Sequence, residues 1–109
     1  MNNQDIFISA NKALADGNYD EFITYCSPHI KWENVGKSTL EGKVELYNYI
    51  SSAYGGLEFT TENYIKENDF IVEFGAIVFE KYGESKKSSY CDIWNFKDGF
   101  IHQLTSFVI

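Results

Sequence analysis

Residues 90–101 read YCDIWNFKDGFI, and this stretch decides the fold that the sequence predicts. Apolar and polar residues alternate before the Asp98-Gly99 pair, which is typical of a β-strand because successive side chains point to opposite faces. Asp-Gly between two such runs is a strong hairpin signal, since both residues accept the positive φ of a type I′ turn. Residues 88–97 and 100–109 are therefore expected to pair as antiparallel strands.

The rest of the C-terminal half is also rich in β-forming residues. Two further β-rich runs are expected at residues 57–66 and 70–82, with turn-like connectors at residues 67–69 and 83–87. Because the connectors are short, the last three runs should form a meander.

The N-terminal half has helical periodicity instead. Apolar spacing predicts two helices within residues 5–25, broken at residues 16–18, with Asn18 or Asp20 as a cap of the second helix. Residues 30–33 are expected to form a short strand, followed by a loop over residues 34–38 and a third helix over residues 41–54. Helices followed by hairpins predict one α+β domain over residues 1–109, in which the helices pack on one face of the sheet.

The composition excludes several classes of function. Nine basic and sixteen acidic residues give a formal charge of −7, which disfavours nucleic acid as a partner. Cys26 and Cys91 lie far apart and form no metal or redox motif, so we expect no metal and no cofactor. No apolar run is long enough to cross a membrane, and the N-terminal residues do not resemble a signal peptide. We therefore expect a cytoplasmic protein without a membrane partner.

Asp92 is the first candidate site residue. The period of two places it on one strand face with three aromatic residues, Tyr90, Trp94 and Phe96. If that face is buried, desolvation raises the pKa of the carboxyl group, which can then donate a hydrogen bond to a developing oxyanion. The alternative is an ordinary aspartate that is solvated or paired with a lysine.

Glu33 is the second candidate carboxylate. It follows Trp32 and precedes a loop, a place from which a carboxylate can act as a general base. Alternation with Ile30 and Trp32 favours the other interpretation, a glutamate that faces solvent.

A pocket for a small apolar molecule is expected beside these carboxyl groups, because aromatic residues make up 17% of the chain. His102 alternates with residues of the last strand that should face the interior. The expected pocket residues are Trp32, Tyr90, Trp94, His102, Leu104 and Val108.

Four segments of the chain carry a family resemblance. Residues 15–20 (ADGNYD), 30–33 (IKWE), 40–43 (LEGK) and 92–101 (DIWNFKDGFI) occur in an order and spacing that resemble the nuclear transport factor 2-like superfamily. Within it, the chain is similar to the SnoaL-like and ketosteroid-isomerase-like proteins. The resemblance covers nearly the whole chain.

This resemblance implies a cone-shaped fold in which a curved, mostly antiparallel sheet and the helices enclose a pocket. Matched to the ketosteroid isomerase pattern, Glu33 stands at the position of the general base and Asp92 at that of the protonated oxyanion donor. The tyrosine donor of that pattern falls at Ala10 in this sequence, which leaves the implied oxyanion site incomplete.

Two functions stay open from the sequence. The first is a SnoaL-like binding module for a small apolar or cyclic ligand. The second is a cofactor-independent isomerase, cyclase or dehydratase-type enzyme that uses Glu33 as base and Asp92 as acid. A homodimer is expected in either case, because so apolar a sheet should not leave a large patch exposed.

Overall fold

The chain folds into three helices and a six-stranded sheet, described for residues 1–109 by a computed structural model. The helices are α1 (Asn3–Ala15), α2 (Tyr19–Thr24) and α3 (Lys43–Ala53). The strands are β1 (Cys26–Asn34), β2 (Ser38–Glu41), β3 (Glu58–Glu67), β4 (Phe70–Lys81), β5 (Glu84–Lys97) and β6 (Phe100–Val108). None of the helices combines the length and apolarity needed to cross a bilayer.

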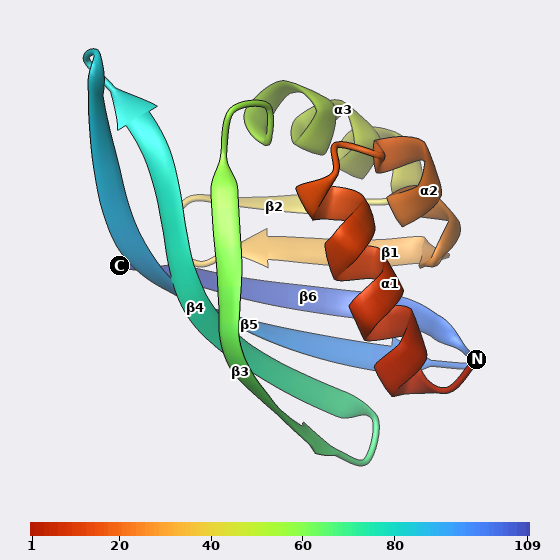
Figure 1. The fold of residues 1–109 in the computed structure, drawn as a ribbon. Helices are drawn as coiled ribbons and strands as arrows, with labels where there is room; N and C mark the ends of the chain where they lie inside the picture. The colour runs from red at the N-terminus through yellow and green to blue at the C-terminus, as the bar shows by residue number, and fades with distance from the viewer.

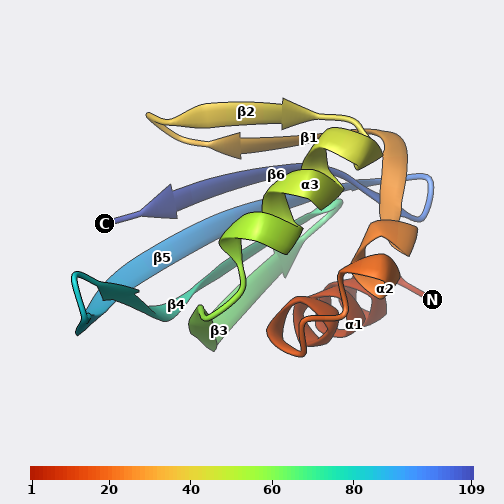
Figure 2. The ribbon, with the colours of Figure 1, turned by 90° about the horizontal axis from the view of Figure 1, so that it is seen from above.

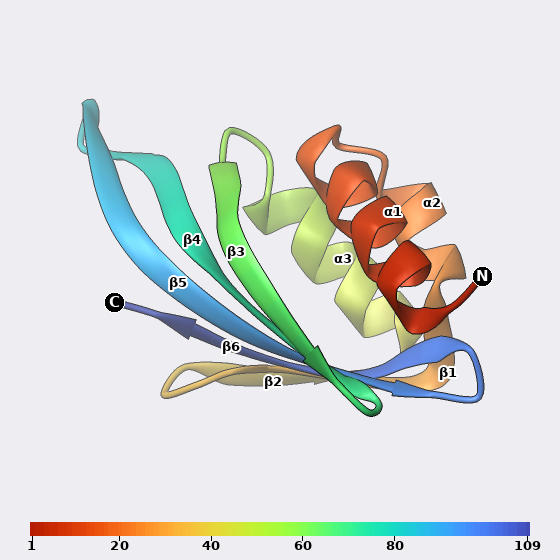
Figure 3. The same cartoon turned by 60° about the horizontal axis from the view of Figure 1, so that its bottom comes forward.

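The sheet has the strand order β2-β1-β6-β5-β4-β3. All neighbours are antiparallel except β1 and β6, which run parallel. The sheet is strongly curved, and the three helices lie on its concave side (Figures 1, 2 and 3). This arrangement confirms the expected α+β fold and the meander of the last three strands.

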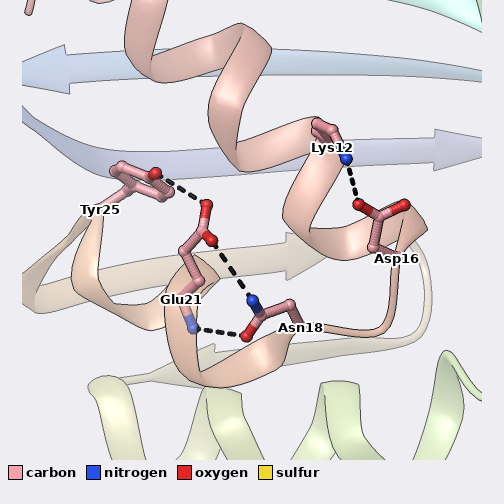
Figure 4. Close-up of polar contacts among 5 residues, drawn as sticks. All are labelled: Lys12, Asp16, Asn18, Glu21 and Tyr25. Atoms are coloured by element: carbon pink, nitrogen blue, oxygen red, sulfur yellow. Dashed lines mark hydrogen bonds and ion pairs between the residues drawn. The ribbon is translucent and has the colours of Figure 1, made fainter.

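The junction of α1 and α2 is held by polar contacts (Figure 4). Asn18 caps α2, because its side-chain oxygen accepts the Glu21 N–H at 3.2 Å. The Glu21 carboxylate in turn accepts hydrogen bonds from the Asn18 amide at 3.3 Å and the Tyr25 hydroxyl at 2.9 Å. Lys12 and Asp16 form an ion pair at the end of α1. Of the two caps expected from the sequence, the structure selects Asn18.

The hairpin of β4 and β5 is longer than predicted. The expected connector at residues 83–87 is wrong, because β5 already begins at Glu84 and the turn is the pair Tyr82-Gly83, with φ of 55° and 78°. This tip extends past the helices (Figure 1), so its strand residues are exposed to solvent. Residues 84–87 are polar or charged, which is why their sequence is like that of a loop.

The edge near β1 also differs from the prediction. Ser38–Glu41 is a strand, where the sequence predicted the end of a loop and the start of a helix, and α3 begins only at Lys43. An exposed edge strand of four residues carries too little periodicity to be recognised. The first strand is longer than expected and includes Pro28, which lies where the register with β6 shifts between Cys26 and Lys31.

The core lies between the concave face and the helices. Tyr90, Asp92, Trp94 and Phe96 share one face of β5, as the period of two predicted, and the structure shows that this face points inward and is buried. From α1, Phe7 packs edge-on against Trp94, with ring centroids 5.2 Å apart.

Gly75 allows β3 to come close to β4. A β-carbon at this position would lie 2.0 Å from the carbonyl oxygen of Thr60 and 3.0 Å from the ring of Tyr90. Because Gly75 has no side chain, the Thr60 carbonyl of β3 and the Tyr90 ring can lie close to its backbone.

The convex face of the sheet is partly apolar. Ile65, Phe70, Phe74 and Phe107 point to this side by alternation, and all four are exposed in the single chain. The homodimer stays a prediction.

Candidate functional site

Asp92 occupies the middle of the concave face. Its cross-strand neighbours are Glu73 on β4 and Ser106 on β6. Only 9% of Asp92 is exposed, and its Oδ1 atom is buried without a hydrogen-bond partner. Asp92 lines a cavity of about 30 Å³, called here the inner cavity. An unpartnered buried oxygen is costly, and this one belongs to a residue that lines the inner cavity.

The carboxyl group of Asp92 titrates near neutrality. Burial raises its pKa from 3.8 to about 7, the Ser106 side chain opposes this shift, and the neighbouring Glu73 charge adds to it. Near pH 7 the protonated and ionised forms are thus both populated. Asp92 can donate a hydrogen bond in the first form and accept a proton in the second.

Glu73 is the most heavily bonded side chain of the site. It is 1% exposed and accepts four hydrogen bonds from neutral donors on three other elements. Oε1 accepts from the Trp94 indole at 3.0 Å. Oε2 accepts from Thr61 at 2.7 Å, Asn11 at 3.1 Å and Tyr90 at 3.1 Å. These donors satisfy the carboxylate, so Glu73 acts as a structural centre that joins α1, β3, β4 and β5.

The Glu73 hydrogen-bond network also orients the Tyr90 side chain at the inner cavity. Its hydroxyl donates to Glu73 and lies 3.2 Å from the Thr61 hydroxyl. Burial raises the pKa of Tyr90, the nearby Thr61 hydroxyl opposes the shift, and the Glu73 charge adds to it, so the phenol stays protonated. Tyr90 therefore offers its ring to the cavity, while its proton is committed to Glu73.

A second, larger cavity continues from the first. This outer cavity has a volume of about 340 Å³ and shares four lining residues with the inner one: Tyr54, Ile77, Ser106 and Val108. The two spaces therefore adjoin, and together they are called the pocket below, with the smaller inner cavity as its deep end and the larger outer cavity as its entrance side. The outer volume lies within the range of small-molecule sites, roughly 300–1,000 Å³.

Three aromatic rings, Tyr54, Phe59 and Tyr90, line one side of this pocket, and Trp32 packs against Tyr54 from the core. The centroid distances are 5.9 Å from Trp32 to Tyr54, 6.3 Å from Tyr54 to Phe59 and 6.3 Å from Phe59 to Tyr90. All three pairs meet edge to face, a favourable geometry for aromatic contacts. The wall is thus rigid and mostly apolar.

Residues 9–104, which run from α1 into β6, match the family model of the SnoaL-like domain. This chain belongs to the SnoaL-like family. No curated protein sequence matches the chain.

Solved structures share the fold of this SnoaL-like domain at low sequence identity. An NTF2-like protein of unknown function from Cytophaga hutchinsonii is 24% identical, with a TM-score of 0.81 over 95% of this chain and 96% of that chain. TerC, co-crystallised with polyporic acid, is 17% identical, with a TM-score of 0.83 over 95% and 88%. A proposed SnoaL-like polyketide cyclase from Shewanella denitrificans is 11% identical, with a TM-score of 0.87 over 98% and 90%. At these identities the likeness shows the fold alone.

Among the predicted site residues, Tyr90, Asp92 and Val108 line the pocket of this SnoaL-like domain. Trp32, Trp94 and Leu104 are buried in the core behind the pocket wall. For these three residues, a role in binding stays a prediction, and their observed role is to support the wall.

Glu33 and His102 lie away from the pocket. Glu33 follows the buried Trp32, pairs with Thr105 of β6, and by alternation points to the convex face. His102 is the extra residue of a β6 bulge, because Ile101 and Gln103 pair with consecutive residues of β5. The bulge interrupts the alternation that had placed His102 inside. Neither residue lines either cavity.

Glu73 was not singled out from the sequence, although a signal was present. Residues 71, 73, 75 and 77 form one face of the predicted strand and read Ile, Glu, Gly and Ile. An acid on an otherwise apolar strand face indicates a carboxylate with buried partners.

Glu73→Gln tests the hydrogen-bond network of this SnoaL-like domain. A glutamine has one acceptor oxygen and brings a donor NH₂ group toward donors, so buried groups lose their partners. We expect the free energy of unfolding in urea to fall by about 2–4 kcal/mol. Glu80→Gln, an exposed change on the same strand, is the matched control. Equal losses in the two variants would contradict a central role for Glu73.

Asp92→Asn tests the raised pKa. Between about pH 4 and pH 7 the folded chain retains an Asp92 proton that the unfolded chain has released, so the folded state loses stability as the pH rises through this range. The asparagine variant has no carboxyl group to titrate at this position, so it does not lose this stability. The difference in unfolding free energy, variant minus native, should therefore increase by about 2–3 kcal/mol from pH 5 to pH 8 in urea titrations. A constant difference between the two proteins would show that Asp92 titrates normally.

Proposed function

We propose that this SnoaL-like domain binds a small apolar or cyclic molecule, with Asp92 hydrogen-bonded to a carbonyl or hydroxyl oxygen at the deep end of the pocket. The observation that carries this proposal is the buried, unpartnered Oδ1 atom of Asp92 beside the inner cavity.

The energetics of burial support the proposal. A buried polar atom without a partner costs about 1–3 kcal/mol, which a ligand oxygen at the correct place would recover. The remaining wall, from Tyr90 to Tyr54 and Ile77, offers mainly apolar contact. A polar contact at the deep end of a mainly apolar cavity selects a molecule with a mostly hydrophobic frame and a polar atom at its leading end.

A structural neighbour gives limited support of the same kind. TerC was co-crystallised with polyporic acid, which makes binding of a small organic molecule a reasonable expectation for this fold. Because a shared fold does not imply a shared ligand, the proposal for this chain depends on its own pocket residues.

A second candidate function is cofactor-independent proton transfer, as in an isomerase, cyclase or dehydratase. The observation that favours it is the pKa of Asp92, about 7, because general acids and bases work best near the operating pH. Asp92 would protonate or deprotonate the bound molecule. The role of Glu33 as base is carried over from the family resemblance, and its place outside both cavities makes it the weaker part of this candidate.

The binding proposal is tested with 2-tetralone, a cyclic ketone, and tetralin, which has the same frame without the oxygen. The ketone only accepts hydrogen bonds, so it requires protonated Asp92. We expect it to bind about threefold to tenfold more tightly than tetralin at pH 6, and this advantage should disappear near pH 8.5. NMR titration of the ¹⁵N-labelled protein measures both affinities.

Asp92→Asn is the informative variant for this experiment. The amide donates a hydrogen bond at any pH, so the preference for the ketone should persist and lose its pH dependence. Asp69→Asn removes an exposed carboxylate and should behave like the native sequence. An equal affinity for ketone and hydrocarbon at pH 6 would overturn the proposed role of Asp92.

Proton transfer is tested separately by deuterium exchange at the α-carbons of 2-tetralone, followed by NMR in D₂O. If the second candidate is correct, the native protein accelerates exchange and Asp92→Asn reduces the acceleration at least about tenfold. Glu33→Gln then decides whether that residue takes part. A native rate no higher than that without protein would leave binding as the function.

A further inference from the structure

The entrance of the outer cavity is formed by the turn between β1 and β2. Asn34, Lys37 and Ser38 line it together with Tyr49 of α3. The turn is closed by a hydrogen bond from the Lys37 N–H to the Asn34 carbonyl at 2.9 Å, and Gly36 supplies the positive φ of 80°. The polar side chains at the entrance are therefore held by a defined turn.

The direction of the hydrogen bonds at the entrance follows from Trp32. Its indole N–H is only a donor, so the Asn34 atom 3.0 Å away must be the amide oxygen. The Asn34 NH₂ group then donates to the Ser38 oxygen at 3.1 Å. Because Ser38 accepts in this bond, its own proton remains available to an acceptor outside the network.

Lys37 is the one charged residue in the lining of the outer cavity. Lys37 forms no ion pair, since the two ion pairs of the chain join Lys12 to Asp16 and Lys86 to Glu84. No carboxylate lines the outer cavity, and Asp92 is the only acid in the lining of the inner one. In a chain with sixteen acidic and nine basic residues, this end of the pocket is locally cationic and rich in donors.

We propose that the ligand of this pocket is an amphipathic anion, whose oxyanion group, such as a carboxylate, binds Lys37 and Ser38 at the entrance while its apolar body extends toward Asp92. This inference rests on the proposed function and adds the chemical class of the ligand.

The two ends of the pocket make different demands on such a ligand. The deep end, at Asp92, fits one neutral oxygen, because a negative charge on the ligand there would be repelled by Glu73 and by the ionised form of Asp92. The entrance fits the anion, because Lys37 supplies a positive charge and Ser38 a free donor. The polarity of the pocket therefore sets the orientation of the ligand.

Two fluorescent probes test this inference: 8-anilinonaphthalene-1-sulfonate and N-phenyl-1-naphthylamine. They share one aromatic frame, and only the first carries an anion. We expect Lys37→Gln to weaken binding of the sulfonate about threefold to tenfold and to leave binding of the neutral probe within about twofold. Ser38→Ala should have a smaller effect in the same direction.

Lys31→Gln is the matched control. Lys31 is an exposed lysine on β1 that lines neither cavity, so this change alters the net charge equally without altering the entrance. It should leave the affinities of both probes unchanged. Added salt should weaken binding of the sulfonate probe to the native protein more than to Lys37→Gln, because salt screens the attraction between Lys37 and the sulfonate group.

A third set of variants separates this inference from the proposed function. Val108→Trp and Leu57→Trp narrow the pocket from two different elements and should each weaken both probes. If neither variant weakens the neutral probe, the probes bind elsewhere, and both the pocket and the anion proposal fall. If the pocket variants weaken both probes but Lys37→Gln affects the two equally or not at all, binding in the pocket stands and the anionic class is overturned.

Discussion

The buried carboxylate of Glu73 is the interaction on which the rest of the concave face depends. Removing a charge from water is costly, and the cost is tolerable here because four donors surround the two oxygens. The donors come from α1, β3 and β5, so the same contacts that stabilise the charge also hold the first helix against the sheet. The same hydrogen bonds to Glu73 hold the side chains of Tyr90 and Trp94 in place.

Two acids side by side have taken opposite roles because their partners differ. Glu73 is surrounded by donors, whereas Asp92, its cross-strand neighbour, has an unpartnered oxygen and a pKa near 7. Burial raises the pKa of Asp92, and the neighbouring Glu73 charge adds to this shift. The pocket acid is therefore coupled to the structural group behind it, and changes to either are expected to affect both.

The sequence predicted the parts of the fold that depend on local periodicity. Alternation in residues 90–96 correctly placed four side chains of β5 on one face, and Asp98-Gly99 located the last hairpin. The short edge strand β2 was missed because it has little burial of its own. His102 was placed inside because a bulge, which shifts the alternation by one residue, leaves no trace in the periodicity.

The site was predictable in part for the same reason. Asp92 was visible as an acid within an aromatic strand face, a local pattern. The donors of Glu73 come from residues 11, 61, 90 and 94, and the entrance joins the β1–β2 turn to α3, so both depend on pairings between distant segments. A single sequence contains no direct signal of such pairings.

Gly75 limits how this pocket can change in evolution. β3 approaches β4 so closely that Gly75 has no room for a β-carbon, and a larger residue there would displace Thr60 or the Tyr90 ring, which lines the inner cavity. Selection can instead reshape the pocket through Ile77 and Val108, whose side chains line it and can vary in size. New ligand preferences should therefore arise at these side chains and at the entrance, while Gly75 stays constant among descendants of this chain.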